Sequence, residues 1–316
     1  MRTLRFLTAV PAAFFLCAAV FRPVSAAGRE YLDWIKAAKQ GDTEKAYLAG
    51  TAFYRGSGGA KRDYKKAFEW FSKAALGDHL SACVRLGDMY AYGQYVDRNP
   101  AEALKWHLKA AFAGDPEGME KAGDDYLERQ DSEGYYAEAA AWYRRAADAT
   151  GARGVSFKLA RLYYSGGPGV ERADDRALPL FLKVFEAGEP DAARYLSGIY
   201  EARGDLKTAG EWLRKGAEEG GPTVMFYLAK AYLDLEEYAG KGLVAPSAAQ
   251  AYKWLCVLLK IEPQPRYAKL RKKASAKLSK AARIKAEKEA ETLLAGFDPK
   301  SGKGPRFRAR GKPIKK

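Results

Sequence analysis

Tryptophan recurs at a fixed interval along this chain. Trp34, Trp70, Trp106 and Trp142 are each 36 positions apart. The interval becomes looser afterwards, where the series continues with Phe181, Trp212 and Trp254. A second aromatic series consists of Phe53, Tyr90, Tyr126, Tyr163, Tyr200 and Tyr232, and small residues lie three positions before its members, at Gly50, Gly87, Gly123, Ala160, Ser197 and Ala229. Self-similarity at such a period is typical of repeat architectures, so the two series predict six units and the end of a seventh.

Each unit is predicted to contain two helices. In the second unit, SACVRLGDMYAYG and AEALKWHLKAAFAGD both place apolar residues at helical spacing, and helix breakers lie between them, from Gly93 to Pro100. Asn99 is the expected N-cap of the second of these helices, as Asp63 and Ser247 are elsewhere. One helix pair cannot bury its own apolar face, whereas stacked pairs share a continuous core. The tryptophans are therefore interpreted as packing residues, and Trp106 as a wedge between successive units.

The repeated motifs resemble those of the Sel-1-like repeat family, which is related to tetratricopeptide repeats. The resemblance rests on VRLGDMYAYG at 84–93, GGPGVERADD at 166–175 and KKAFEWFSKAALGD at 65–78, and it covers roughly residues 30–296. It implies an all-α fold, a right-handed superhelical α-solenoid of about six helix-turn-helix repeats with a C-terminal capping helix pair. The cysteine pairs that staple each unit in some secreted members are absent, so the activities of that subgroup are not carried over.

The first 26 residues are expected to be a signal peptide. Arg2 and Arg5 precede an apolar run from Phe6 to Phe21, and small residues follow at Val24-Ser25-Ala26. The run is shorter than the roughly 20 residues of a spanning helix, which favours cleavage near Ala26 over retention as a membrane anchor. We therefore expect export, either to the periplasm of a bacterium or as a secreted protein, with the repeats occupying residues 27–264.

Positive charge is concentrated at the C-terminal end. Residues 265–316 hold 18 Lys and Arg against four Asp and Glu, while residues 27–264 are close to neutral. Residues 265–296 keep apolar spacing and are predicted to form basic capping helices, whereas residues 297–316 have little to bury and are expected to be a disordered tail. The tail could bind an anionic envelope polymer or membrane surface, or only aid solubility. The residues proposed for such binding are Arg306, Arg308, Arg310, Lys312, Lys315 and Lys316.

No catalytic, cofactor-binding or metal-binding constellation is found in the sequence. His79 and His107 are its only histidines, no S-x-x-K motif occurs, and the glycine loops lack a phosphate-binding lysine motif. Both histidines, and Cys83 and Cys256, are interpreted as structural. The acidic pairs Asp124-Asp125, Asp174-Asp175 and Glu236-Glu237 are interpreted as solvated, and no cofactor is expected.

Function is therefore expected to lie in a binding surface. By analogy with tetratricopeptide-like solenoids, the first helix of each unit should line a concave groove with mixed charge and many aromatic residues. This suits a protein or peptide partner and not a nucleic acid. The residues predicted to line it are Tyr47, Tyr54, Arg85, Asp88, Tyr92, Lys158, Arg161, Tyr164, Arg194, Glu201, Phe226 and Lys230.

The leading hypothesis is an exported, non-enzymatic scaffold that binds through this groove. The alternative is an envelope-polymer or membrane-surface binder that acts through the basic end. A cell-wall or β-lactam hydrolase is a minor alternative.

Overall fold

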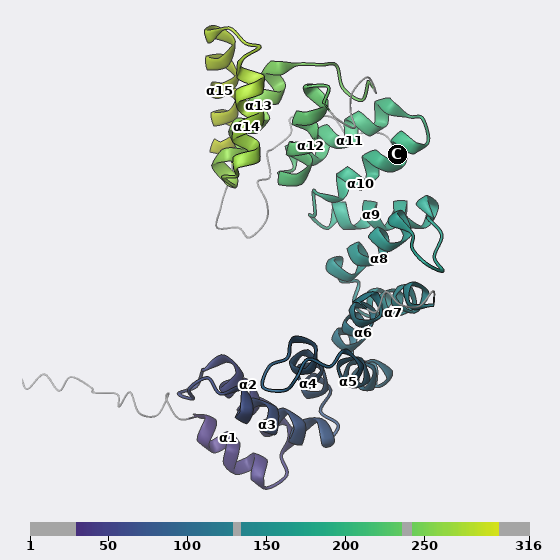
Figure 1. Cartoon of the computed structure of the whole chain (residues 1–316), viewed down its shortest axis with the longest axis vertical. Helices are drawn as coiled ribbons and strands as arrows, with labels where there is room; N and C mark the ends of the chain where they lie inside the picture. The colour runs from purple at the N-terminus through teal and green to yellow at the C-terminus, as the bar shows by residue number, and fades with distance from the viewer. Residues whose placement is uncertain (1–29, 129–133, 236–241, 297–316) are drawn as a thin grey trace, which may run out of the picture. The chain divides into compact units, whose positions relative to one another are not determined.

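The computed structural model describes residues 30–128, 134–235 and 242–296 (Figure 1). The chain divides into two compact units, residues 1–103 and 104–316. The helices of the first unit are α1 (Glu30–Lys39), α2 (Thr43–Arg55), α3 (Tyr64–Leu76) and α4 (Leu80–Tyr92), and α5 (Pro100–Phe112) contains the boundary. The helices of the second unit are α6 (Pro116–Glu128), α7 (Tyr135–Thr150), α8 (Arg153–Ser165), α9 (Asp174–Glu186), α10 (Ala192–Ala202), α11 (Leu206–Glu218), α12 (Pro222–Tyr232), α13 (Ala248–Ile261), α14 (Pro265–Ser275) and α15 (Lys280–Ala295).

Helices pack mainly on their neighbours in sequence. In the first unit α2 packs on α1 and α3, and in the second unit each helix from α6 to α13 packs on the next. We call α2, α4, α6, α8, α10 and α12 the first helices of the repeats and α3, α5, α7, α9, α11 and α13 the second helices. Helix α13 also packs on both α14 and α15 (Figure 1). The basic segment therefore forms the expected helix pair, and this pair covers the last repeat.

A single hydrogen bond closes the link between the two helices of several repeats. The carbonyl oxygen of the aromatic residue near the end of the first helix accepts from the backbone N–H of the residue that precedes the second helix. The pairs are Phe53 with Asp63, Tyr90 with Asn99, Tyr163 with Ala173, Tyr200 with Asp205, and Tyr232 with Ser247, at 2.8–2.9 Å. The links differ in length, yet the last residue of each one donates to the equivalent carbonyl group of the first helix.

The N-caps predicted from the sequence are confirmed. The side chains of Asp63 and Ser247 accept from backbone N–H groups three residues later. The Asn99 side chain accepts from Ala101 and Glu102 at 3.1 Å. These bonds satisfy N–H groups that the first turn of a helix leaves without partners.

The small residues of the first helices make room for rings of the second helices. A Cβ on Gly50 would lie 2.6 Å from the ring of Phe71, and one on Gly123 would lie 2.6 Å from the ring of Tyr143. Each ring belongs to the residue after the tryptophan. The small residues at these two positions thus allow the second helix to approach the first closely.

The tryptophan series also needs one correction. Phe181 is the eighth residue of α9, as Phe71 is of α3, and both are fully buried. Phe181 thus continues the series of the residue after tryptophan. Trp142 is buried but Trp70 and Trp106 are only half-buried, and a lysine or arginine three residues later covers the ring in each case. The spacing W-x-x-K/R therefore places a cation on an aromatic face.

Candidate functional site

Aromatic side chains follow one another across the first helices of the second unit, and all of them are half-buried except Tyr267, which is 1% exposed. Their rings lie on α8, α10 and α12, and the set reaches Tyr267 on α14. We call this set the aromatic row; it consists of Phe157, Tyr164, Tyr195, Phe226, Tyr227 and Tyr267. The centroids of Tyr164 and Tyr195 are 5.4 Å apart, and those of Phe226 and Tyr267 are 5.2 Å apart. Gly198 allows the close approach of α8 and α10, because a Cβ there would overlap the Tyr164 hydroxyl.

Cationic side chains cover the faces of these rings. The Arg194 guanidinium lies 4.4 Å from the ring centroid of Tyr227 and 5.2 Å from that of Tyr195. Arg172 lies over Tyr164 at 4.7 Å, and Arg266 over Phe226 at 5.0 Å. Burial raises the pKa of Tyr164, which therefore stays neutral at physiological pH. The row thus alternates aromatic faces with permanent positive charge.

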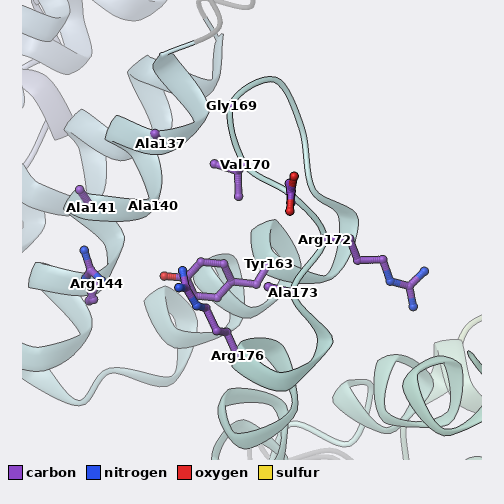
Figure 2. A pocket seen from close by; sticks show the side chains of 11 residues that line it. Ala137, Ala140, Ala141, Arg144, Tyr163, Gly169, Val170, Arg172, Ala173 and Arg176 are labelled. Atoms are coloured by element: carbon purple, nitrogen blue, oxygen red, sulfur yellow. The ribbon is translucent and has the colours of Figure 1, made fainter. Parts of the chain in front are cut away.

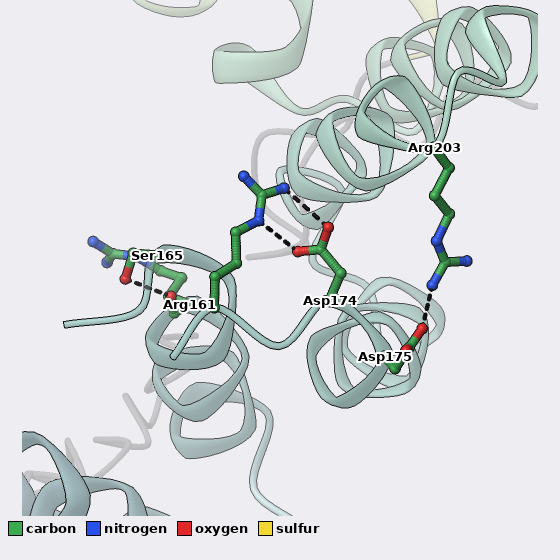
Figure 3. A network of polar contacts seen from close by, with 6 residues as sticks. Arg161, Ser165, Asp174, Asp175 and Arg203 are labelled. Atoms are coloured by element: carbon green, nitrogen blue, oxygen red, sulfur yellow. Dashed lines mark hydrogen bonds and ion pairs between the residues drawn. The ribbon is translucent and has the colours of Figure 1, made fainter. Parts of the chain in front are cut away.

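Arg172, and Arg203 nearby, form ion pairs with the two adjacent aspartates at the start of α9. Arg172 makes a two-point contact with Asp174, at 2.8 and 3.0 Å, and the Arg203 guanidinium lies 2.6 Å from the carboxylate of Asp175 (Figure 3). Asp175 is 96% exposed, so its contact with Arg203 is weak in water. Arg194 has no ion pair within the described residues.

A second polar group joins α6, α7 and α8. Lys158 Nζ lies 2.7 Å from carboxylate oxygens of both Asp124 and Glu120, and the Tyr143 hydroxyl donates to Asp124 at 2.6 Å. Burial opposes the charge on Lys158, but the bonds to Asp124 and Glu120 outweigh burial and raise the pKa of Lys158. Burial, followed by the charge of Asp124, raises the pKa of Tyr143. The group ties three successive helices together.

The adjacent carboxylate points to a different partner. Asp125 Oδ2 lies 2.6 Å from His107 Nδ1, and His107 is 1% exposed. Burial raises the pKa of Asp125 above its ordinary value, although the bond to His107 acts in the opposite direction. The interpretation of Asp124-Asp125 as a solvated pair is therefore wrong. Asp174 and Asp175 are also paired, and Glu236-Glu237 lies outside the described residues.

In the first unit, the predicted groove residues are engaged in packing. Tyr47 stacks on His79 with ring centroids 4.5 Å apart, and Tyr54 meets Tyr64 edge-on at 5.5 Å. Arg85 pairs with Asp88 at 2.7 Å. Asp88 is buried, whereas Tyr92 is 65% exposed. Asp88 is thus placed inside the protein, and of this group Tyr92 presents the most surface.

In the second unit, the structure brings Tyr164, Arg194 and Phe226 into the aromatic row or onto it. Lys158 is held by the carboxylates of α6, while Arg161 is exposed and Glu201 half-buried. Lys230 is 7% exposed, and its Nζ lies over Phe226 and Tyr227. The prediction that Lys230 lines an open surface is therefore wrong, because its side chain is buried and its Nζ lies against these two rings.

Sequence reasoning missed several members of this surface. Tyr195 and Tyr227 were not predicted, although each stands next to a predicted residue, Arg194 or Phe226. Arg172 and Arg266 lie on a link and on the capping pair, outside the first helices. Both arginines reach their rings from another part of the fold, Arg172 from the link after α8 and Arg266 from α14. The spacing of residues along one helix face gives no signal for such contacts. The predicted tail residues Arg306 to Lys316 lie outside the described residues.

The two cysteines that the structure describes lie in packed surroundings. Cys83 is buried and Cys256 is half-buried, and burial raises the pKa of the Cys256 thiol. In the described part of the chain, no three His, Cys, Asp or Glu side chains gather as a metal site would require. Nor does any helix there have the length and apolar character needed to cross a membrane.

Comparison with known proteins identifies the repeats. The family model for the Sel1 repeat matches residues 46–79, 80–115, 121–150, 156–189, 191–221 and 222–256. The crystal structure of a Sel1 repeat protein from Oxalobacter formigenes is 27% identical and has a TM-score of 0.55; the match covers 74% of this chain and 95% of that chain. A protective antigen of uropathogenic Escherichia coli with an SLR fold is 23% identical, has a TM-score of 0.40, and the match covers 90% of this chain and 76% of that chain. No curated protein matches the chain.

The six matched segments follow the helix pairs described above and span more than half of the chain. The Oxalobacter structure has the same repeat fold over most of its own length. The chain belongs to the Sel1 repeat family.

Proposed function

We propose that this Sel1 repeat protein is a non-catalytic scaffold that binds a protein or peptide partner on the aromatic row. The observation that carries the proposal is the position of Arg194. Its guanidinium lies over the rings of both Tyr195 and Tyr227, at 5.2 and 4.4 Å from their centroids, with no ion pair in the described part of the chain. Two neighbouring helices thus hold a permanent charge on a half-exposed aromatic surface.

This arrangement of a guanidinium on aromatic rings is suited to binding a partner and not only to stabilising the fold. A guanidinium on an aromatic face keeps its N–H edge available for a carboxylate, and the rings restrict its motion before the partner arrives. Tyrosine and arginine are the residue types that dominate binding hot spots. The aromatic row supplies both, over at least α8, α10 and α12.

The charge around the row indicates an acidic partner segment. Helix α14, which carries Arg266 and Tyr267, has five basic residues and no acidic one. Lys269, Arg271, Lys272 and Lys273 are all exposed. Complementary charge accelerates association and sets orientation, so an extended segment with acidic side chains suits this surface best.

The test compares Arg194→Gln with a control variant, Arg203→Gln. The control also removes one arginine, but that arginine pairs with the solvent-exposed Asp175. Wild type and both variants capture partners from an extract of the source cells, and the retained proteins are quantified. Binding of a specific partner should fall about tenfold or more in Arg194→Gln and stay unchanged in Arg203→Gln, with equal helical content by circular dichroism. Equal retention by all three proteins would show that the row does not bind the partner.

The basic end supports a second candidate function, binding to an anionic envelope polymer or membrane surface. The exposed basic residues of α14 carry this candidate, and each is worth about 1 kcal/mol near an anionic membrane. Replacing Lys269, Lys272 and Lys273 by glutamate, or deleting residues 297–316, should abolish salt-sensitive sedimentation with anionic vesicles. Unchanged sedimentation of both variants would exclude this function.

We further propose that the protein is exported and that residues 1–26 are removed. The motivation is the segment of two arginines, an apolar run and small residues, which lies outside the described residues. Fractionation of cells followed by N-terminal sequencing tests this directly. A mature N-terminus near Ala27 in the envelope fraction is expected, and an intact Met1 in the cytoplasmic fraction would contradict it.

A further inference from the structure

A cavity of about 380 Å³ opens among α7, the end of α8 and the link to α9 (Figure 2). This size falls in the range of small-ligand sites. Its lining consists of Ala137, Ala140, Ala141, Arg144, Tyr163, Gly169, Val170, Glu171, Arg172, Ala173 and Arg176. Two adjacent tyrosines of α8 face different places: Tyr163 lines the cavity, whereas Tyr164 belongs to the aromatic row.

Two arginines supply the charge of this cavity. Arg176 lies over the ring of Tyr163, 5.8 Å from its centroid, and Arg144 projects from α7. In Figure 2 the Arg176 side chain lies beside the ring of Tyr163, whereas the Arg172 side chain points away from that ring. Arg172 binds Asp174 instead. Neither Arg144 nor Arg176 has an ion pair within the described residues.

The carboxylates nearby are engaged elsewhere, with one exception. Asp174 binds Arg172, and Asp175 lies 2.6 Å from Arg203. Glu171 is exposed and lines the cavity with the arginines. The two unpaired guanidinium groups therefore outnumber the remaining carboxylate, and the cavity favours a ligand with negative charge.

The rest of the lining selects the class of anion. Ala137, Ala141 and Val170 give one part of a largely polar lining an apolar surface, and the mostly buried Tyr163 adds a ring with a hydroxyl at its end. An inorganic ion would leave this surface without a partner, whereas the hydrocarbon part of an organic acid would cover it. Two guanidinium groups match the planar geometry of a carboxylate.

We propose that this cavity binds an organic carboxylate through Arg144 and Arg176, with its hydrocarbon part against the alanines of α7. The carboxylate belongs either to a free organic acid or to an acidic side chain of a protein. Arg172 lines the cavity and also covers Tyr164 of the aromatic row, but in the described part of the chain Arg144 and Arg176 are not in contact with the row, so neither proposal depends on the other.

Calorimetric titration of the full chain tests the site with two probes. Glutarate represents a free acid, and N-acetyl-glutamate-N-methylamide represents a glutamate side chain. Saturable binding is expected with a dissociation constant on the order of 1 mM for ligands this small. Binding of glutarate alone assigns the site to a free acid, and binding of the blocked glutamate assigns it to a protein side chain.

Variants locate the binding. Arg144→Gln and Arg176→Gln should each weaken it about tenfold, whereas Arg145→Gln should not, because Arg145 is on α7 but lies over Trp142 at 4.8 Å. Ala137→Leu should weaken binding without changing the charge, since Ala137 is exposed at the cavity wall and leucine takes up part of the space beside it. Equal losses in all three arginine variants, unchanged binding by Ala137→Leu, equal affinity for inorganic phosphate, or no saturable binding would each overturn the proposal.

Discussion

The Nδ1 atom of His107 lies 2.6 Å from Oδ2 of Asp125, and this pair joins helix α5 of one repeat to helix α6 of the next. His107 is the eighth residue of α5, as Phe71 is of α3 and Phe181 of α9. Helix α5 thus carries a histidine, paired with a carboxylate of α6, where α3 and α9 carry a phenylalanine. A buried pair of this kind contributes little net stability, but it becomes costly when one partner is removed.

Breaking this pair should destabilise the protein more than replacing it. His107→Phe leaves the half-buried Asp125 carboxylate without its partner, which should lower the free energy of unfolding by about 2 kcal/mol. The double variant His107→Phe/Asp125→Leu restores the apolar character of the other repeats and should lie within about 1 kcal/mol of wild type. Urea unfolding measures both. A double variant less stable than the single one would contradict this interpretation of the pair.

The raised pKa of Asp125 predicts a pH-dependent stability difference. Because burial raises the pKa in the folded state, the folded protein binds a proton that the unfolded chain has already released between pH 3.8 and that raised value. Stability from this group is thus full below pH 3.8 and is lost as the pH rises through the folded pKa. Relative to Asp125→Asn, wild type should gain stability as the pH falls through this window. A difference in unfolding free energy that is constant with pH would refute the assignment.

The glycine of the first helix should resist substitution where a ring covers it. Gly123→Ala places a Cβ 2.6 Å from Tyr143 and should cost about 1–3 kcal/mol, because neither the buried ring nor the helix can move freely. Gly154→Ala is the control, since Gly154 lies in α8 with no atom within 4 Å of the added Cβ. It should be neutral or stabilise by up to about 1 kcal/mol. Thermal unfolding of the two variants would show the difference, and equal melting temperatures would argue against the close packing.

The Tyr143 hydroxyl should contribute through its bond to Asp124. Tyr143→Phe keeps the ring but removes the donor 2.6 Å from Oδ1 of Asp124, which should cost about 1 kcal/mol. Tyr92→Phe removes a hydroxyl from a tyrosine that is 65% exposed and should have no measurable effect. Chemical denaturation distinguishes the two, and an unaffected Tyr143→Phe would show that the bond adds nothing.

Periodicity made the helices predictable. The tryptophan interval and the caps at Asp63, Asn99 and Ser247 each depend on local spacing, and the structure reproduces them. The identity of the packing ring was not predictable in this way. One residue along a helix turns the side chain by about 100°, so the choice between Trp70 and Phe71 as the buried residue depends on the neighbouring helix.

The polar and aromatic partners that lie on other helices could not be predicted from the sequence either. Asp124 and Asp125 look alike in one dimension, but one faces Lys158 of α8 and the other His107 of α5. Arg172 and Arg176 likewise cover two successive rings of α8, Tyr164 and Tyr163, which face different surroundings. Such contacts depend on how one helix sits against another, in the same repeat or in the next, and the spacing along a single helix does not contain that information.

Photo-crosslinking tests the central claim, that the aromatic row binds a protein partner, most directly. Benzoylphenylalanine replaces Tyr227 in the row or, as a control, Phe112, an aromatic residue of α5 that is 74% exposed and outside the row. Irradiation in the source cells, followed by mass spectrometry, identifies the adducts. A defined protein adduct from position 227 and none from position 112 is the predicted result; equal adducts from both positions, or an adduct from position 112 alone, would contradict the claim.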